Sequence, residues 1–223
     1  GFLVIFLAGI TQGITGFGFA LVSVPIMLLL LPPKIVVPIV LIHTALIGVF
    51  LLYGAKQHIE FKRILPLIIT SLIGMPLGTY LLLILSAGTL KIMIGTVSTI
   101  FAVALLIGFK VNIKNEKLVM IPVGFTSGLM NGSTSMSGPP VVLLLANQGT
   151  QKHNFRANLI LYFLILNMLT IPTHIIGGLI TREVTKYALT FLPAMILGAL
   201  FGMKLHNKIE ENLFKKIALI IVA

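Results

Sequence analysis

Cysteine and aspartate are both absent from this sequence. Without cysteine the chain has no disulfide, no thiolate nucleophile and no cysteine-based metal site. The acidic residues are all glutamates, and they lie in or beside polar connections, at Glu60, Glu116, Glu183, Glu210 and Glu211. Carboxylate proton relays and carboxylate metal cages inside the apolar segments are therefore nearly excluded. The sequence predicts neither a metal site nor a cofactor.

Charge of either sign is scarce: charged residues make up 9% of the chain, whereas 57% is hydrophobic. Apolar runs long enough to cross a bilayer recur along the sequence. We expect such segments near 2–31, 35–55, 64–85, 92–109, 118–146, 159–180, 187–203 and 213–223. The connections are too short for a soluble domain, and the first segment lacks the basic start and cleavage site of a signal peptide. The sequence thus predicts an all-α, multi-pass protein of the cytoplasmic membrane.

The few charges are mostly positive, with a formal net charge of +11. In a membrane protein this excess indicates topology and attraction to anionic lipid, so the bilayer is an expected partner. Nucleic acid is not expected, because the basic residues are dispersed and no recognition fold has room to form. A homo-oligomer is compatible with the sequence, although no pattern in it specifies one.

Two glycine-rich stretches interrupt the apolar pattern at matching places. The first covers residues 9–18 and the second covers 124–140, which is also rich in hydroxyl groups. An offset of 115 residues places Gly9 on Gly124 and Gly13 on Gly128. Paired interruptions of this kind are typical of transporters built from two repeats, with the binding site at the interruptions.

Later segments repeat as well. Gly74-x-x-x-Gly78 is echoed by Gly198-x-x-x-Gly202, a spacing that allows close contact between membrane helices. We therefore predict two repeats, 1–107 and 117–223, within one transmembrane domain. Each repeat holds one glycine-interrupted segment followed by three plain ones.

Each interrupted segment is either a broken spanning helix or a hairpin that enters and leaves on the same side. A single helix of about 29 residues would be roughly 43 Å long, against a hydrocarbon core of about 30 Å. If all the segments cross, eight basic residues lie on each face, whereas two hairpins place twelve on one face and four on the other. We favour hairpins, because they restore a positive-inside bias. Three spans per repeat would then make the repeats inverted.

The tips of the interrupted segments carry the groups expected to bind a ligand. Helical legs that end there leave backbone N–H groups unpaired, and a helix N-terminus carries the positive end of the helix dipole. Glycines allow close backbone approach, and hydroxyl and amide side chains add donors. Such a site suits a small oxyanion; the alternative is that these residues only satisfy the broken backbone of a structural kink. The candidate binding residues are Gln12, Thr15, Gly16, Phe17, Gly18, Asn131, Gly132, Ser133, Thr134, Ser135, Ser137 and Gly138.

Four more residues are candidates for coupling or accessory roles. His43 lies within an apolar span, and the register that pairs Gly54 with Gly178 places it opposite Asn167. His43 either titrates and couples transport to protons, or forms a neutral hydrogen bond to a neighbouring helix. Arg156 and Asn158 open the sixth segment, where Arg156 either guides anions or marks the cytoplasmic boundary.

At the paired glycine motifs the chain resembles the sulfite exporter TauE/SafE family of membrane anion transporters, also called the toluene sulfonate uptake permease family. The family pattern has a glycine-rich stretch and then a proline near the start of each half, matched here by 9–20 with Pro25 and by 124–140. The resemblance covers nearly the whole chain and implies transport of an anion such as sulfite, thiosulfate or sulfoacetate. The glycine triplet common in the family is replaced here by Gly16-Phe17-Gly18 and by residues 131–138, which leaves the particular substrate open.

Three classes of function compete. A secondary transporter for a small sulfur-containing oxyanion or organosulfonate is the leading interpretation. An anion channel that uses the same hairpins as its filter is the alternative. A membrane-embedded enzyme is disfavoured, because the chain has no Gly-x-Ser-x-Gly motif, no cysteine or aspartate, and no histidine-rich metal spacing.

Overall fold

The computed structural model describes residues 1–106, 116–147 and 151–206, and no strand occurs among them. The all-helical prediction is therefore confirmed. A 3-10 turn, η1 (Lys56–His58), joins α3 to α4. The helices are α1 (Phe2–Thr15), α2 (Phe19–Met27), α3 (Pro33–Ala55), α4 (Phe61–Ile84), α5 (Ala87–Leu106), α6 (Glu116–Thr134), α7 (Gly138–Asn147), α8 (Lys152–Ile176) and α9 (Arg182–His206). The predicted last segment, 213–223, lies outside the described residues.

Four helices within the described residues are long and apolar enough to cross a membrane. They are Pro33–His58, Phe61–Ile84, His153–Ile176 and Arg182–His206, and they correspond to the predicted second, third, sixth and seventh segments. Shorter apolar helices cover Phe2–Thr15 and Ala87–Ile100. This is the pattern of a multi-pass membrane protein.

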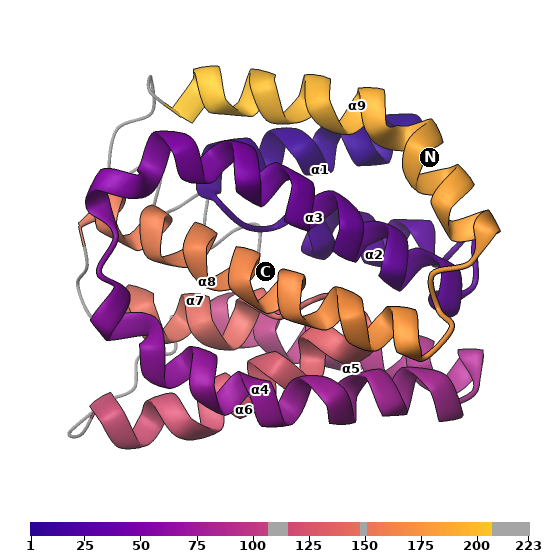
Figure 1. Cartoon of the computed structure of the whole chain (residues 1–223), viewed down its shortest axis with the longest axis horizontal. Helices are drawn as coiled ribbons and strands as arrows, with labels where there is room; N and C mark the ends of the chain where they lie inside the picture. Colours follow the sequence, from indigo (N-terminus) through magenta and orange to yellow (C-terminus); the bar gives the residue numbers. More distant parts are fainter. Residues whose placement is uncertain (107–115, 148–150, 207–223) are drawn as a thin grey trace.

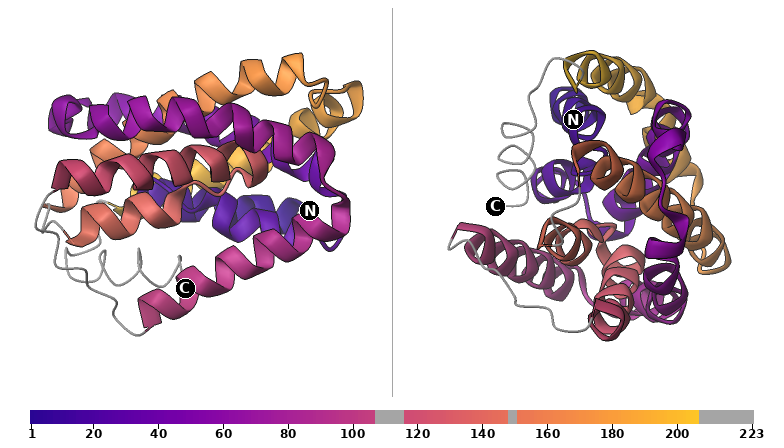
Figure 2. Two further views of the ribbon diagram at one scale, coloured as in Figure 1. Left: turned by 90° about the horizontal axis from the view of Figure 1, so that it is seen from below. Right: turned by 90° about the vertical axis from the view of Figure 1, so that its left-hand side faces the viewer.

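The predicted first and fifth segments are each divided into two helices. Figure 1 shows α1 running from the right-hand end into the molecule and α2 running back towards that end. The pair α6 and α7 does the same from the left-hand end, and Figure 2 shows both pairs from other directions. Each interrupted segment therefore folds as a hairpin whose tip lies inside the helical bundle.

The longer helices surround these hairpins. The helices α3 and α8 pack together and run in opposite directions, and α4 and α9 also run in opposite directions (Figure 1). Helix α1 lies along α9, and α6 lies along α4. Each hairpin is thus packed against a spanning helix from the other half of the chain.

Glycines permit both of these close helix pairs. A Cβ added at Gly9 would lie 2.9 Å from the Met195 carbonyl oxygen, and one at Gly13 would lie 2.5 Å from that of Ala199. On the other side, a Cβ at Gly78 would overlap the Leu129 carbonyl of α6. The close contact predicted from small-x-x-x-small spacing is confirmed, because side chains at these positions would push the helix backbones apart.

Buried apolar side chains form two main clusters. One cluster lies mainly among α1, α2, α3 and α9, where it includes Ile47 and Met195, and it extends to Ile160 of α8. The other joins α4, α6, α7 and α8, and includes Leu67 and Tyr162. We call these groups of helices the first bundle and the second bundle. The hairpin tips meet where the two bundles face each other.

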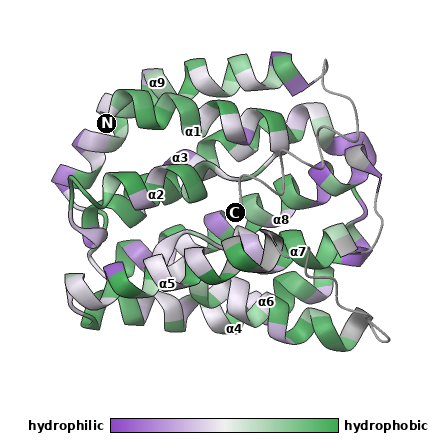
Figure 3. Cartoon of the chain, turned by 180° about the vertical axis from the view of Figure 1, so that it is seen from behind, coloured by the Kyte–Doolittle hydropathy of each residue, from purple (hydrophilic) through white to green (hydrophobic). Residues whose placement is uncertain are grey.

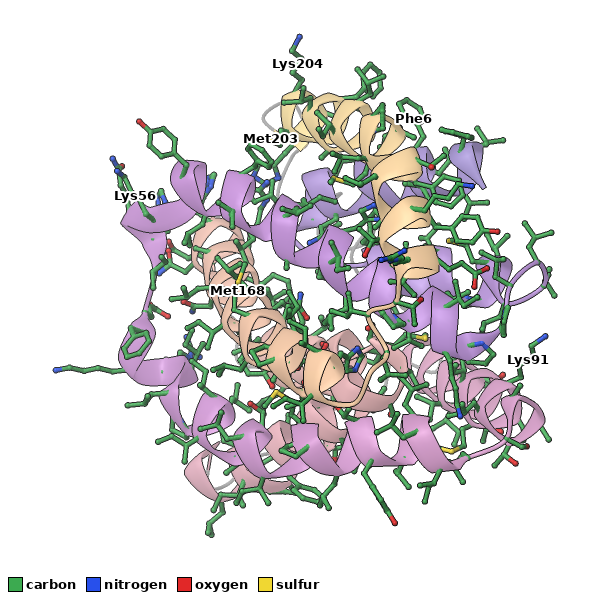
Figure 4. All side chains as sticks on the ribbon, turned by 45° about the vertical axis from the view of Figure 1, so that its right-hand side comes forward. Phe6, Lys56, Lys91, Met168, Met203 and Lys204 are labelled. Atoms are coloured by element: carbon green, nitrogen blue, oxygen red, sulfur yellow. The ribbon has the colours of Figure 1, made fainter. Side chains whose placement is uncertain are left out.

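The outer surface has the distribution of polarity expected in a bilayer. Large apolar side chains such as Ile73 and Ile92 are exposed on the helix flanks. In Figure 3, hydrophilic residues gather towards the two ends of the molecule. Lys56, Lys91 and Lys204 point away from the helices in Figure 4. An apolar belt between polar ends is what lipid requires of a spanning protein.

Candidate functional site

The tip of the first hairpin is shaped by two glycines. Gly16 has φ 85° and Gly18 has φ 95°, in the left-handed region that glycine adopts without strain. The Thr15 hydroxyl donates to the Thr11 carbonyl at 2.8 Å and accepts from the Phe17 N–H at 3.3 Å. The Gly16 N–H also donates to the Gln12 carbonyl. The last carbonyls of α1 therefore have hydrogen-bond donors where the chain reverses.

The tip of the second hairpin repeats this geometry with different residues. Ser135 has φ 57° and its N–H donates to the Asn131 carbonyl at 3.0 Å. The Thr134 hydroxyl donates to the Met130 carbonyl at 2.8 Å and accepts from the Met136 N–H at 3.2 Å. The two threonine caps correspond at an offset of 119 residues, which pairs Gly13 with Gly132. The offset of 115 residues found in the sequence pairs Gly13 with Gly128 instead, four residues before Gly132.

A cavity of about 30 Å³ lies between the two tips. This space corresponds to about two water-sized spheres. One part of its lining is polar and the other is apolar and largely aromatic. The lining residues are Gln12, Phe17, Gly18, Phe19, Ala20, Leu21, Thr44, Ser135, Met136, Ser137, Gly138, Phe163 and Asn167.

Two helix N-termini open onto this cavity. Helix α2 begins at Phe19 and α7 begins at Gly138, and both residues line the space. Each start presents N–H groups without an acceptor in the helix, together with the positive end of a helix dipole. Pro139 and Pro140 remove two of these donors from α7, because proline has no N–H. The first tip therefore supplies mainly backbone amides, and the second supplies the hydroxyls of Ser135 and Ser137.

Asn167 connects the cavity to a buried network of amides and hydroxyls. It donates to the Thr44 hydroxyl at 3.0 Å and accepts from Asn131 Nδ2 at 3.1 Å. Asn131 also donates to the Thr170 hydroxyl at 2.9 Å. The predicted site residue Asn131 thus stands behind Asn167, where it orients the amide that faces the cavity.

The predicted binding residues divide into two groups. Gln12, Phe17, Gly18, Ser135, Ser137 and Gly138 line the cavity. Thr15 and Thr134 cap the helices, Gly16 lies against Arg156 and Ile160, and Gly132 lies against α4. The Ser133 hydroxyl donates to the Leu129 carbonyl at 2.8 Å, within its own helix. This second group shapes the tips and does not face the cavity.

His43 is fully buried beside the cavity-lining Thr44 but does not line the cavity. Its Nε2 lies 2.9 Å from the Ala188 carbonyl oxygen, and its ring meets Phe19 edge to face. Donation from Nε2 to a carbonyl leaves Nδ1 as the acceptor nitrogen of a neutral ring. Nδ1 is buried with no hydrogen-bond partner among the described residues. His43 therefore has a hydrogen-bond partner on a neighbouring helix, and its role in coupling stays a prediction.

Asn158 lies away from the cavity, at the α3–α4 connection. It accepts from the Glu60 N–H at 2.8 Å and donates to the Glu60 carboxylate at 3.2 Å. Asn154 donates to the same carboxylate at 2.9 Å, and Arg63 forms an ion pair with it at 3.2 Å. Hydrogen bonds, first from Asn154 and then from Arg63 and Asn158, hold the pKa of Glu60 below its usual value. These hydrogen bonds hold the start of α8 against the connection between α3 and α4.

Arg156 bridges the two bundles. Its Nη2 donates to the Gly13 carbonyl at 2.8 Å, which joins α8 to the tip of the first hairpin. The side chain is only 8% exposed. Arg156 is therefore placed next to the cavity-lining Gln12 without lining the cavity itself.

Sequence reasoning missed several lining residues. Phe19, Thr44 and Phe163 lie in long apolar runs, where nothing distinguishes a cavity-facing phenylalanine from a core or lipid-facing one. Thr44 could have been identified from the sequence, because a hydroxyl next to His43 in an apolar span is unusual. Its contact with Asn167 joins positions 123 residues apart in the chain.

An apolar helical bundle in which two hairpin tips enclose a polar cavity defines a multi-pass membrane protein of the transporter class. The family model described as Sulfite exporter TauE/SafE matches residues 1–223, the whole chain, and the protein belongs to this family. This is a family of sulfite or anion exporter-type membrane transporters, in agreement with the prediction that the chain is not an enzyme. Searches of curated proteins and of solved structures gave no match.

Proposed function

We propose that the protein is a secondary transporter that carries a small sulfur-containing oxyanion or organosulfonate, of the sulfite, thiosulfate or sulfoacetate type, across the cytoplasmic membrane. The observation that carries the proposal is the meeting of two helix N-termini, from two different hairpins, at one cavity. Neutral donors arranged in this way bind anions without a lysine or arginine at the site.

The chemistry of the lining supports an oxyanion with several acceptor oxygens. Backbone N–H groups at residues 19–21 and the hydroxyls of Ser135 and Ser137 supply donors from two sides. The Ser135 hydroxyl donates to the Val37 carbonyl at 3.0 Å, and a χ1 rotation would redirect it towards a ligand. Phe17, Phe19 and Phe163 bound the other side, which offers an apolar surface to the hydrocarbon part of an organosulfonate.

The proposal includes two inverted repeats, 1–107 and 117–223. The opposite directions of α3 and α8, and of α4 and α9, support it, as do the hairpins entering from opposite ends (Figure 1). The packing between the repeats supports it too: α1 of the first repeat packs on α9 of the second, and α6 of the second repeat packs on α4 of the first. Alternating access would then arise from movement of one bundle against the other around the cavity.

The placement of basic residues supports an orientation. The end of α3, the starts of α4, α6 and α8, and the end of α9 share the left-hand end in Figure 1. Lys56, Lys62, Arg63, Lys117, Lys152 and Lys204 belong to these helix ends, whereas Lys34, Lys91, Arg182 and Lys186 belong to the opposite end. We assign the left-hand end to the cytoplasm by the positive-inside rule. Protons are the candidate coupling ion, with His43 as the titrating group.

The test measures binding of sulfite, thiosulfate, sulfoacetate, taurine and sulfate to the purified chain by calorimetry. At least one of the anions should bind, and the Ser135→Ala, Ser137→Ala double variant should bind it about 10- to 100-fold more weakly, because hydrogen bonds to charged groups contribute about 1.5–3 kcal/mol. Ser98→Ala is the control, since the Ser98 hydroxyl donates within its own helix, to the Ile94 carbonyl of α5, and Ser98 does not line the cavity. Equal affinity of the double variant and the control would refute the cavity as the site.

A flux assay in proteoliposomes separates the transporter from the channel. A transporter saturates with substrate and is accelerated by substrate on the far side. Flux that stays proportional to concentration, with no such acceleration, would establish the channel instead.

A further inference from the structure

Arg156 is a buried cation with most of its hydrogen-bonding capacity unused. A guanidinium group has five N–H donors in a planar fork. Among the described residues, the structure gives this side chain one hydrogen bond, from Nη2 to the Gly13 carbonyl oxygen. Its Nε is buried and has no hydrogen-bond partner within residues 1–106, 116–147 and 151–206. The group therefore has donors available for a second acceptor.

No carboxylate in the described part of the chain neutralises this charge. The nearby Glu60 is bound by Asn154 and Asn158, and its ion pair is with Arg63. Asn154 and Asn158 lie two residues on either side of Arg156, about 200° around the helix axis, so Glu60 faces a different side of α8. A buried charge without a counter-charge is costly, and it persists where function requires it.

Arg156 shares a helix face with residues that line the cavity. On α8 the positions 156, 160, 163 and 167 follow the spacing 4, 3, 4, which aligns them along one side of a helix. Phe163 and Asn167 line the cavity, and Ile160 and Arg156 contact the tip at Gly16. Arg156 lies about 10 Å from Phe163 along the helix axis, towards the end where α8 begins. Arg156 thus lies on the same face of α8 as the cavity-lining residues, with the buried Ile160 between them.

We propose that Arg156 forms a second anion subsite, between the cavity and the end of the molecule where α8 begins. In this subsite the fork of Nε–H and the Nη2–H on the same side of the guanidinium binds two oxygens of the transported oxyanion, while the other Nη2–H keeps the tip of the first hairpin in place. Planar, bidentate contact with oxyanions is the geometry that distinguishes arginine from lysine. The subsite rests on the proposed transport of an oxyanion.

The test uses the full chain in a maltoside detergent, which has no phosphate group that could occupy the subsite, with 15N-labelled arginine. The chain has three arginines, Arg63, Arg156 and Arg182, so the Nε–H signals are few. Variants R63K and R182K assign the Arg156 signal by elimination. Titration with sulfite, thiosulfate or sulfoacetate should shift this signal saturably and leave the other two in place.

Affinity measurements separate binding from mere support of the tip. R156K retains the charge and a donor for the Gly13 carbonyl but loses the fork, so anion affinity should fall about tenfold to a hundredfold. R182K is the matched control, because Arg182 is exposed at the other end of the molecule, and it should bind as the native chain does.

Each remaining outcome is decisive. An Arg156 signal that stays still while calorimetry detects a bound anion overturns the subsite and leaves the cavity proposal standing. An R156K variant with native affinity shows that the residue only supports the tip, which also overturns the subsite. No binding of any of the three anions overturns both proposals.

Discussion

Replacing Gly13 with alanine should destabilise the protein, because the added Cβ has no room between α1 and α9. It would lie 2.5 Å from the Ala199 carbonyl oxygen and 2.9 Å from Gly202 Cα. Non-bonded carbon atoms normally lie about 3.5–4.0 Å apart. These neighbours are backbone atoms, which no rotamer change can move, so the helices must separate.

The expected cost follows from two opposing terms. Overpacking of this kind costs about 1–3 kcal/mol, and rigid backbone on the other side of the contact favours the upper value. Alanine recovers about 1 kcal/mol of helix propensity relative to glycine. The net loss of about 2 kcal/mol corresponds to a fall in Tm of about 4–8 °C for a chain of this size.

The measurement is thermal unfolding of the purified variant in detergent, beside a matched glycine replacement. Gly95→Ala in α5 serves as the control, because a Cβ there would meet nothing within 4 Å. The control should be as stable as the native chain or up to about 1 kcal/mol more stable. If Gly13→Ala melts no lower than the control, the close approach of α1 and α9 is refuted.

The remaining predictions concern orientation and pH. In the cysteine-free chain, a cysteine replacing the exposed Lys56 should be labelled only from the cytoplasm and one replacing Arg182 only from outside; the reverse pattern would invert the assignment. His43→Gln should flatten the pH dependence of anion flux if His43 is the coupling group, and an unaltered profile would remove it from that role. The pKa of Glu60 is lower in the folded protein than in the unfolded chain, where it is about 4.3. The stabilisation from its contacts with Asn154 is therefore fully present above the unfolded pKa and is lost as the pH falls through the folded pKa. As the pH falls from about 5 to 3, the free energy of unfolding of the native chain should decrease by up to about 1 kcal/mol more than that of the Glu60→Gln variant. Thermal unfolding of both proteins across this pH range measures the difference. Parallel curves for the two proteins would contradict this linkage.

The fold class and the breaks in the apolar segments could be predicted from the sequence, because both depend on local chemistry. Lipid requires continuous apolar helices, and the segments 35–55 and 64–85 are apolar enough to form them, although they contain Pro38, Pro66 and Pro76, which membrane helices tolerate. Glycines at 16 and 18 mark the first break, since they adopt backbone angles that other residues resist. The second break was harder to place to the residue, because there the left-handed position is occupied by Ser135, not by glycine.

The candidate site could be predicted only in part. Gln12, Ser135 and Ser137 stood out as polar groups at interruptions of apolar sequence, and they line the cavity. Thr15, Thr134 and Ser133 stood out for the same reason, but their hydroxyls are used by neighbouring carbonyls of α1 and α6. Composition does not distinguish a hydroxyl that caps a helix from one that faces a cavity, because both occur at helix ends.

The sequence by itself determined that this protein is built of membrane helices and that two glycine-containing, polar stretches interrupt them. Only the tertiary structure decided that each hairpin packs on a helix from the other half, and that Thr44 and Phe163 join the cavity. It also decided that Arg156 has a single carbonyl as its hydrogen-bond acceptor within the described residues. The physical reason is the range of the interactions. Turns and spans follow from neighbours in the chain, whereas the packing contacts join distant residues, such as Gly78 with Leu129, 51 positions apart, and Gly9 with Met195, 186 positions apart.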